Sequence, residues 1–254
     1  MPPAPQLGPG DHSLPLPRLA AARSPSSDGR APAAGRAAAS ALIVCGMDHD
    51  ELHAAARYAY EAGELKLSRR TGWWHAGVRD PESVAEHSWR TAVIGYALAV
   101  IEGADAAATA AMCVFHDMVE TRIGDIPLIA RQYVSHQPHE AIVRDQTLDL
   151  PAAVRDSLRD LMDAYEAQES PEARLARDAD KLECLIQARE YEHRGYGAVQ
   201  PWIDSNYAQL RSAAARGLAD AALEIAPDAW WRRVAALRRT PADASDPRPG
   251  PQRS

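Results

Sequence analysis

The sequence contains a single phenylalanine, and alanine is abundant among its apolar residues. β-Strands favour β-branched and aromatic side chains, whereas alanine is the best helix former and permits close contacts between helices. With 254 residues, 46% of them hydrophobic, the chain can build one large core or two small ones. The composition therefore favours an all-α fold over a sheet.

Cysteine is also scarce. The three cysteines, Cys45, Cys113 and Cys184, lie far apart in the sequence and form no CxxC pair. This spacing argues against a zinc ribbon and against a disulfide framework. We therefore expect a cytoplasmic protein, because a reducing compartment is the simplest setting for unpaired thiols.

The chain has no excess of positive charge, since its formal net charge at pH 7 is −7. Proteins that bind nucleic acid polymers cluster Lys and Arg against the phosphate backbone, so we expect no such partner. A small anionic substrate needs only a local positive group. No apolar run approaches the roughly 20 residues that cross a bilayer, so we expect no membrane association.

The two ends of the sequence differ from its centre. Residues 1 to about 40 are rich in Pro, Ala, Gly, Ser and Arg, and such a segment cannot bury enough apolar surface to offset the entropy lost on ordering. The apolar stretch 37–45 is short for a signal peptide, and no A-x-A cleavage site follows it. We expect a disordered extension over 1–46, one ordered domain over 47–238 and a disordered tail over 239–254.

Between these ends the hydrophobic pattern is helical throughout. Ser83 with Glu86 forms a capping-box pattern, and Ser170 before Pro171 is a favoured helix start. The segment 66–81, which carries two arginines and two tryptophans, is expected to be a loop. The expected helices cover residues 48–62, 83–101, 105–120, 129–136, 151–167, 171–193, 201–225 and 229–237.

A His-Asp pair, His116-Asp117, lies inside the apolar run 114–120, with His87 upstream and two candidate carboxylates, Asp178 and Asp180, downstream. Imidazole and carboxylate are groups that a divalent metal takes from a protein, so four of them converging from three helices would form a hydrolytic metal centre. Spacing alone does not choose between Asp178 and Asp180. A buried histidine is also commonly a hydrogen-bonded core residue, which is the structural alternative.

Glu120 follows His116 by four residues and Asp117 by three. In a helix this spacing puts its carboxylate on the same face, one turn away. From there Glu120 could orient a metal-bound water or take its proton, as a general base does.

These residues form part of an ordered set of motifs that resembles the HD-domain superfamily of metal-dependent phosphohydrolases. Segments 70–73 and 81–88 are similar to the small branch of HD-domain 5′-deoxynucleotidases. The resemblance covers roughly residues 50–215 and is far more specific than a lone His-Asp pair. In chain order the motifs are Arg70-Thr71-Gly72-Trp73, Pro81-Glu82-Ser83-Val84-Ala85-Glu86-His87-Ser88, His116-Asp117-x-x-Glu120, Gly124-Asp125-Ile126-Pro127 and Ala179-Asp180-Lys181-Leu182-Glu183.

The resemblance implies a metal-binding role for four residues. They are His87, His116, Asp117 and Asp180, with Asp180 preferred to Asp178 because the family has Asp directly before Lys in this motif. A mixed shell of two histidines and two carboxylates suits Mn, Fe, Co or Zn, and ligand identity does not choose among them.

The resemblance also implies roles around the substrate. Glu120 would position or activate the attacking water, and Asp125 would assist at the phosphate and the leaving oxygen. Arg70, or alternatively Arg69, would hold the phosphate, because arginine makes a bidentate phosphate contact. Trp73 would pack against the sugar.

The expected protein is thus an all-α HD-domain helical bundle that removes phosphate from nucleoside 5′-monophosphates, deoxynucleotides first, and works as a homodimer. Alternatives are another phosphate substrate, such as a specialised-pathway nucleotide, a nucleoside triphosphate or a cyclic nucleotide, or a non-catalytic HD module that only binds. A di-iron oxygenase of the HD type would need further histidines near the His-Asp helix, and Glu120 stands in their place.

Other residues are given no catalytic role from the sequence. His136 and His139 flank Pro138 and are expected to be surface residues. Trp202, Trp230 and Trp231 are expected to serve in packing or at a dimer face.

Overall fold

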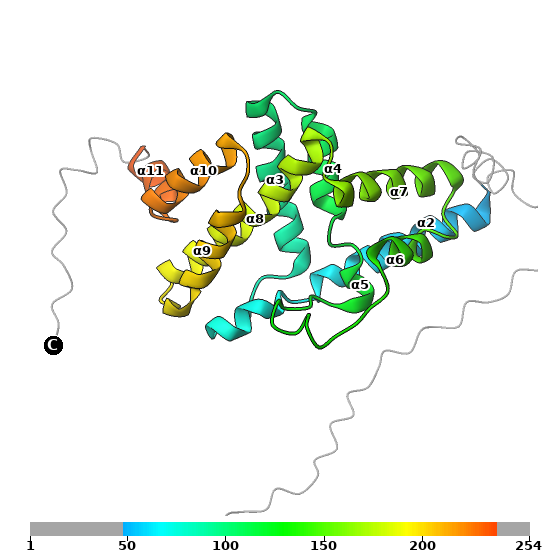
Figure 1. Ribbon diagram of the computed structural model, residues 1–254, viewed down its shortest axis with the longest axis horizontal. Coiled ribbons are helices and arrows are strands. Elements are labelled where there is room, and N and C mark those ends of the chain that lie inside the picture. Colours follow the sequence, from blue (N-terminus) through cyan, green and yellow to red (C-terminus); the bar gives the residue numbers. More distant parts are fainter. Residues whose placement is uncertain (1–47, 238–254) are drawn as a thin grey trace, which may run out of the picture. The chain divides into compact units, whose positions relative to one another are not determined.

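The computed structural model describes residues 48–237. The extensions expected over 1–46 and 239–254 lie outside the described residues. Within residues 48–237 every regular element is an α-helix or a 3₁₀-helix, apart from one isolated antiparallel bridge between Arg69 and Ser83. The all-α prediction is therefore confirmed (Figure 1).

The described residues form ten α-helices and three short 3₁₀-helices, labelled as in Figure 1. The α-helices are α2 (His49–Gly63), α3 (Val84–Glu102), α4 (Ala106–Phe115), α5 (Glu120–Ile123), α6 (His139–Gln146), α7 (Ala152–Ala167), α8 (Pro171–His193), α9 (Gln200–Gln209), α10 (Ala213–Glu224) and α11 (Ala229–Leu237). The 3₁₀-helices are η2 (Glu64–Lys66), η3 (Thr71–Ala76) and η4 (Gly197–Val199). Among these residues, no helix is both long enough and apolar enough to cross a membrane.

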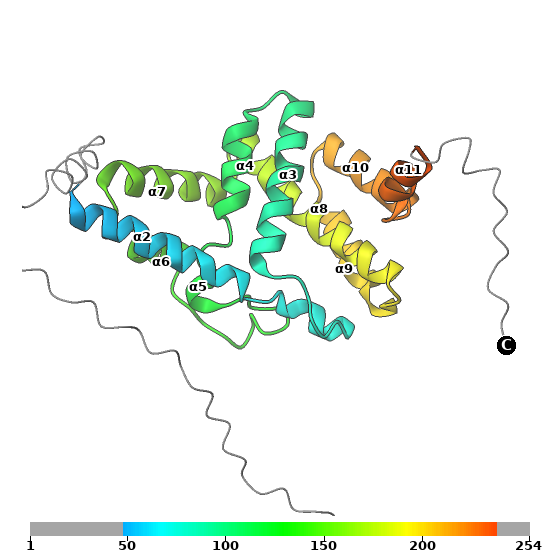
Figure 2. The same ribbon diagram turned by 180° about the vertical axis from the view of Figure 1, so that it is seen from behind.

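Helix α8 is the centre of the core, and 13 of its 23 residues are buried. It packs against α3, α4 and α7 and against α9 and α10. Both views show α3 beside α8 in the middle of the domain, with α2, α6 and α7 towards one end and α9 to α11 towards the other (Figures 1 and 2). A helix packed on several sides presents few positions to solvent, which explains its buried polar residues.

The predicted starts of two central helices are confirmed. At α3 the Ser83 Oγ accepts from the Glu86 amide at 3.2 Å, and the Glu86 carboxylate accepts from the Ser83 amide at 2.6 Å. At α8 the Ser170 hydroxyl accepts from the Ala173 amide at 3.1 Å, with Pro171 in the first turn. These caps satisfy amides that have no partner within the helix.

The helix expected over 105–120 is wrong in its second part. Helix α4 ends at Phe115, and α5 begins again at Glu120. His116 Nδ1 donates to the carbonyl oxygen of Cys113 at 2.8 Å, the carbonyl that an unbroken helix would offer to the Asp117 amide. The chain then continues through turns, with the Glu120 amide donating to the Asp117 carbonyl at 2.9 Å. The break frees Asp117 from the geometry of a regular helix.

Two further expected helices differ from the structure. Residues 129–133 form turns, residues 134–136 have no regular structure, and helix α6 begins only after Pro138. The helix expected over 201–225 is divided into α9 and α10. The two Asp178 carboxylate oxygens accept from the Arg211 amide at 2.9 Å and the Ser212 amide at 2.7 Å, which holds the chain in a non-helical bend.

The close approach of α3, α4 and α8 depends on Gly95. A Cβ atom at this position would lie 2.6 Å from Cys113 Sγ, 3.3 Å from Thr109 Cγ2 and 3.5 Å from Ala179 Cβ. Small residues on all three helices therefore set the distance between the elements that carry the candidate ligands.

Replacing Gly95 tests this contact. We expect Gly95→Ala to lower the free energy of unfolding by about 1–3 kcal/mol, because overpacking a core forces side chains and backbone to shift. Urea denaturation measures the change. Gly217→Ala in α10 is the matched control, since nothing lies within 4 Å of its Cβ position. The control should be neutral or stabilising by up to about 1 kcal/mol, and equal losses in both variants would contradict the packing argument.

Candidate metal centre

Four side chains from three parts of the chain meet at one point. His87 comes from the first turn of α3, His116 and Asp117 from the break after α4, and Asp180 from the middle of α8. His87 Nε2 lies 3.6 Å from Asp117 Oδ2 and 3.3 Å from Asp180 Oδ1. His116 Nε2 lies 3.1 Å and 3.9 Å from the same two oxygens.

These atoms suit a metal ion. Bonds of about 2.0–2.2 Å to nitrogen and oxygen separate neighbouring ligand atoms by roughly 3.0–3.5 Å. Two of the four observed distances, 3.1 and 3.3 Å, lie in this range, and the other two, 3.6 and 3.9 Å, are slightly longer. The Nε2 atoms of both His87 and His116 are buried and have no hydrogen-bond partner. Buried polar atoms are normally satisfied, so two orphaned imidazole nitrogens that face two carboxylates fit a site that a cation completes.

Both imidazole rings are held by their other nitrogen. His87 Nδ1 lies 2.5 Å from Glu183 Oε2, and His116 Nδ1 donates to the Cys113 carbonyl. The Arg90 guanidinium donates two hydrogen bonds to the other oxygen of Glu183, Oε1, at 2.9 Å from Nε and 2.6 Å from Nη2. Since a proton on Nδ1 leaves the Nε2 lone pair free, these contacts orient both rings for metal binding.

Charge in the cluster favours a cation at this point. Burial opposes the charge of Asp180, but Lys181 and His87 hold the pKa of Asp180 well below its usual range. Asp117 behaves likewise, because His116 and Arg70 outweigh the effect of burial and lower its pKa. Both carboxylates are therefore ionised at neutral pH and can act as ligands.

The structure separates the alternatives that the sequence left open. Asp180 faces the two histidines, whereas Asp178 accepts the backbone amides before α10. The Arg70 Nη1 atom lies 3.5 Å from carboxylate oxygens of Asp117 and Asp125. Arg69 instead contacts the Pro81 carbonyl at 3.1 Å and is paired with Asp80 at 3.3 Å. Asp180 and Arg70 thus lie at the cluster, and Asp178 and Arg69 lie elsewhere.

Glu120 lies beside the cluster with a buried, unpartnered Oε2. Burial and the nearby carboxylates of Asp117 and Asp125 raise the pKa of Glu120 to about 9. A positive charge brought into the site would lower this pKa again, because it favours the ionised form. A carboxylate whose pKa depends on a neighbouring cation in this way is a candidate for taking up or releasing a proton at the site.

Asp125 fixes the backbone that leads into η3. Its Oδ2 accepts from the Thr71 amide at 2.5 Å and from the Thr71 hydroxyl at 2.9 Å. Because Thr71 follows Arg70 directly, this contact also sets where the Arg70 side chain begins. Asp125 therefore positions the arginine and offers its Oδ1 to the guanidinium.

A cavity of about 240 Å3 opens next to these residues. Arg131, Arg177 and Lys181 line it in addition to Arg70, and they were given no role from the sequence. Lys181 Nζ lies 2.9 Å from Asp180 Oδ2. The cavity therefore combines a ligand cluster with several cationic side chains, an arrangement suited to an anionic substrate.

Two histidines expected only at the surface also line this cavity. His136 is exposed and His139 half-buried, and their rings stack with centroids 5.6 Å apart. Among the described residues, neither belongs to a group of metal-type side chains whose ligand atoms lie within 4.8 Å of one another. They contribute to the wall and not to the ligand set.

Trp73 is not part of the cavity wall. Only 2% of it is exposed, and it stacks on Trp202 with ring centroids 5.5 Å apart. Its Nε1 donates to Glu82 Oε1 at 3.2 Å. Trp73 therefore has no exposed ring face against which a sugar could pack, as had been expected from the sequence. Trp202 serves in packing, as expected, whereas Trp230 is 72% exposed.

Glu183 and Arg90 were missed as functional residues by the sequence analysis. Each follows a candidate ligand by three residues, Glu183 after Asp180 and Arg90 after His87. This spacing puts them one helical turn away and could have indicated a supporting role. Only the packing of α3 on α8 shows that they meet each other across two helices.

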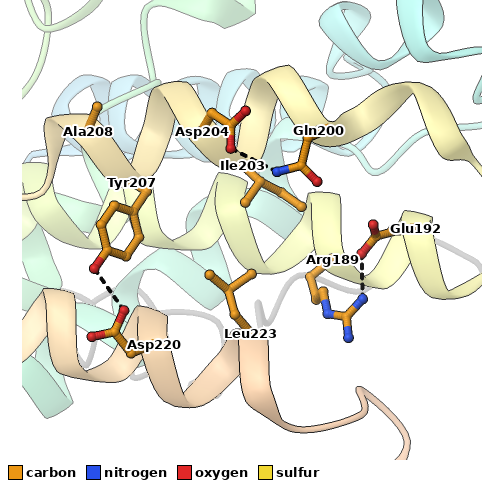
Figure 3. A pocket seen from close by; sticks show the side chains of 9 residues that line it. All are labelled: Arg189, Glu192, Gln200, Ile203, Asp204, Tyr207, Ala208, Asp220 and Leu223. Atoms are coloured by element: carbon orange, nitrogen blue, oxygen red, sulfur yellow. Dashed lines mark hydrogen bonds and ion pairs between the residues drawn. The ribbon is translucent and has the colours of Figure 1, made fainter.

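A larger cavity, about 610 Å3, lies between α8, α9 and α10 (Figure 3). Figure 3 shows its polar side chains paired with each other: Arg189 with Glu192, and the Tyr207 hydroxyl with Asp220 at 2.8 Å. Among the described residues, its lining contains none of the metal-type groups. The smaller cavity at the ligand cluster is thus the candidate site.

Comparison with known proteins agrees with this assignment. The HD domain family model matches residues 62–221. The chain is 33% identical to human 5′-deoxynucleotidase HDDC2 over 147 residues, covering 56% of this chain and 72% of that protein. It is 30% identical to the 5′-deoxynucleotidase hdd1 of Schizosaccharomyces pombe over 139 residues, 52% of this chain and 70% of that one.

The fold is also similar to that of a solved structure. A conserved hypothetical protein from Pyrococcus furiosus is 28% identical, with a TM-score of 0.56 over 67% of this chain and 99% of that one. The family match spans the central helices α3, α4 and α8 and with them all four candidate ligands. The chain therefore belongs to the HD-domain family.

Proposed function

We propose that this HD-domain phosphohydrolase removes the phosphate of nucleoside 5′-monophosphates, with deoxynucleotides preferred. The observation that carries the proposal is the pair of orphaned imidazole nitrogens of His87 and His116, which face Asp117 and Asp180 beside a cavity lined by cationic side chains. The relatives named 5′-deoxynucleotidase support the choice of substrate.

In this proposal His87, His116, Asp117 and Asp180 hold a divalent cation, either Mn, Fe, Co or Zn. When bound, such a cation neutralises phosphate charge and lowers the pKa of a water molecule, which makes hydrolysis possible at neutral pH. Glu183 and the Cys113 carbonyl keep the two imidazole rings in the orientation that binding needs.

Glu120 is the proposed general base. Its free Oε2 points to no protein partner and can accept the proton of the attacking water. It must be ionised to do so, and the positive charge held by the neighbouring ligands favours that form.

Arg70 and Lys181 are the proposed phosphate contacts. Arg70 offers a planar fork that matches two phosphate oxygens, and Lys181 offers a single ammonium group. Asp125 keeps Arg70 near the cluster through Thr71, and in this proposal it also assists at the phosphate and the leaving oxygen. The four ligands, Glu120 and these cations would then surround one phosphate group.

We also propose that the protein acts in the cytoplasm and as a homodimer.

A substrate panel tests the proposed function. Phosphate release should be fastest with deoxynucleoside 5′-monophosphates and slower with the matching ribonucleotides, after metal analysis of the purified protein. Nucleoside di- and triphosphates and cyclic nucleotides complete the panel. Equal rates with deoxy- and ribonucleotides would remove the deoxynucleotide preference, and turnover of triphosphates alone would replace the monophosphate assignment.

The roles of ligand and base predict two different defects. His116→Ala should remove both bound metal and nearly all activity, because one of four protein ligands is lost. Glu120→Gln should retain metal but lose turnover, since the shape is kept and the base is lost. Elemental analysis and initial rates separate the two outcomes. Full metal content in His116→Ala, or unchanged turnover in Glu120→Gln, would contradict the corresponding role.

Glu183→Gln tests the support of His87. The amide can still accept from Nδ1, but it carries no charge and leaves Arg90 without its buried partner. We expect metal affinity, measured by competition with a chelator, to fall by about 10–100-fold. Glu190→Gln is the matched control, since Glu190 contacts the same arginine at 3.0 Å without touching His87. Equal metal affinity in both variants would show that Glu183 does not act through His87.

A further inference from the structure

Helix α5 consists of a single turn, Glu120–Ile123, and carries the proposed base at its first position. So short a helix is not stable in isolation, and the residue before it, Val119, provides no side-chain cap. The Oε2 atom of Glu120 has no protein partner that could hold the carboxylate directly. The position of Glu120 must therefore be set by contacts that its neighbours in this turn make with the rest of the protein.

The next two residues of α5 bind one carboxylate on helix α2. The Thr121 hydroxyl donates to Glu61 Oε1 at 3.0 Å. The Arg122 guanidinium donates to both oxygens of Glu61, at 2.7 Å from Nε to Oε1 and at 3.0 Å from Nη2 to Oε2. A bidentate contact of this kind fixes the direction of the partner as well as its distance. Glu61 thus holds α5 at the two positions that directly follow the base.

Helix α6 contributes a further support. The buried Gln146 donates through Nε2 to Glu61 Oε1 at 2.9 Å and to the Met118 carbonyl, within the break between α4 and α5, at 3.0 Å. Both views show α5 next to α2 and α6 (Figures 1 and 2). We call Glu61, Thr121, Arg122 and Gln146 the Glu61 network.

The end of α2 is a suitable anchor, because it is tied to the helix that carries His87. Leu65, which follows α2 in η2, forms an apolar cluster with Val84 and Met118. Val84 is the first residue of α3 and precedes His87 by three positions. The Glu61 network therefore connects α5 to the part of the fold that already holds one candidate ligand.

The Glu61 carboxylate is charged at neutral pH. The Arg122 guanidinium holds the pKa of Glu61 below its usual value against the opposing effect of burial, and Gln146 and Thr121 add to this effect. Both members of the Glu61–Arg122 pair are partly exposed, and such pairs contribute little to the stability of a whole domain. We therefore expect the network to act on the position of α5 rather than on the melting temperature.

We infer that Glu61 is a positioning residue for Glu120, because it holds the turn that carries this carboxylate next to the metal centre. The inference rests on the proposed role of Glu120 as general base. A base acts only within hydrogen-bond reach of the proton that it takes, so a small displacement of the turn costs turnover. The proposed phosphate contacts, Arg70 and Lys181, lie outside α5, so substrate binding does not depend on the turn in the same way.

Glu61→Gln tests the inference, because the amide nitrogen that replaces one oxygen would face a donor of Arg122. We expect kcat to fall by about 10–100-fold, with KM, metal content and melting temperature close to those of the unmodified protein. Arg122→Gln, which removes the partner on α5, should reproduce this defect. The matched control is Arg57→Gln, since Arg57 lies one turn earlier on α2 and pairs at 3.5 Å with Asp149, outside α5. The control should keep its kcat.

Combination with Glu120→Gln separates positioning from a general structural effect. Once the base has been removed its position no longer matters, so adding Glu61→Gln to Glu120→Gln should cause no further loss of the residual turnover. A further loss as large as that caused by Glu61→Gln alone would overturn the inference.

Hydrogen exchange of the purified full chain gives a readout that does not depend on activity. The backbone amides of residues 118–125 should exchange faster in Glu61→Gln than in the unmodified protein or in Arg57→Gln, because the turn opens more often. Unchanged exchange in Glu61→Gln would overturn the inference and leave the proposed function intact. Full turnover in Glu120→Gln would overturn the proposed base, and the inference with it.

Discussion

The buried imidazole of His87 is held from both sides, and the candidate centre depends on this contact. Glu183 takes one ring nitrogen, and Asp117 and Asp180 lie close to the other. Burial and Arg70 disfavour a charge on the ring, but Glu183 and Asp180 raise the pKa of His87 well above its usual value. The surrounding carboxylates thus favour positive charge at this point, which a proton or a metal cation can supply.

This arrangement explains why α8 carries so many buried polar residues. Asp180 faces the cluster, Glu183 holds His87, and Gln187 accepts from Arg90 at 2.5 Å. Burial opposes the charge of Glu183, yet His87 and Arg90 keep its pKa low. Buried ionic groups are costly unless each is paired, so the ligand cluster and the Arg90 network stabilise each other.

Local sequence was enough to predict the helical class and the caps at Ser83 and Ser170, because helix periodicity and capping act within about four residues. The choice of Asp180 over Asp178 came instead from the family resemblance. The chain breaks could not be predicted in this way. The break after Phe115 requires the His116 ring to take the Cys113 carbonyl, and the bend before α10 requires Asp178 on a distant helix.

The predicted site differs from the observed one for the same reason: motifs are local in the sequence, whereas the site is completed by contacts between distant segments. Motifs identified Asp180 and Arg70 as candidates, but only packing brought Glu183 to His87 and Lys181 into the cavity wall. Packing also buried Trp73, whose ring is covered by Trp202 from 129 positions further along the chain. Sequence by itself thus determined which groups are available for chemistry. Tertiary structure decided which of them face the cavity, because that depends on contacts between helices far apart in the chain.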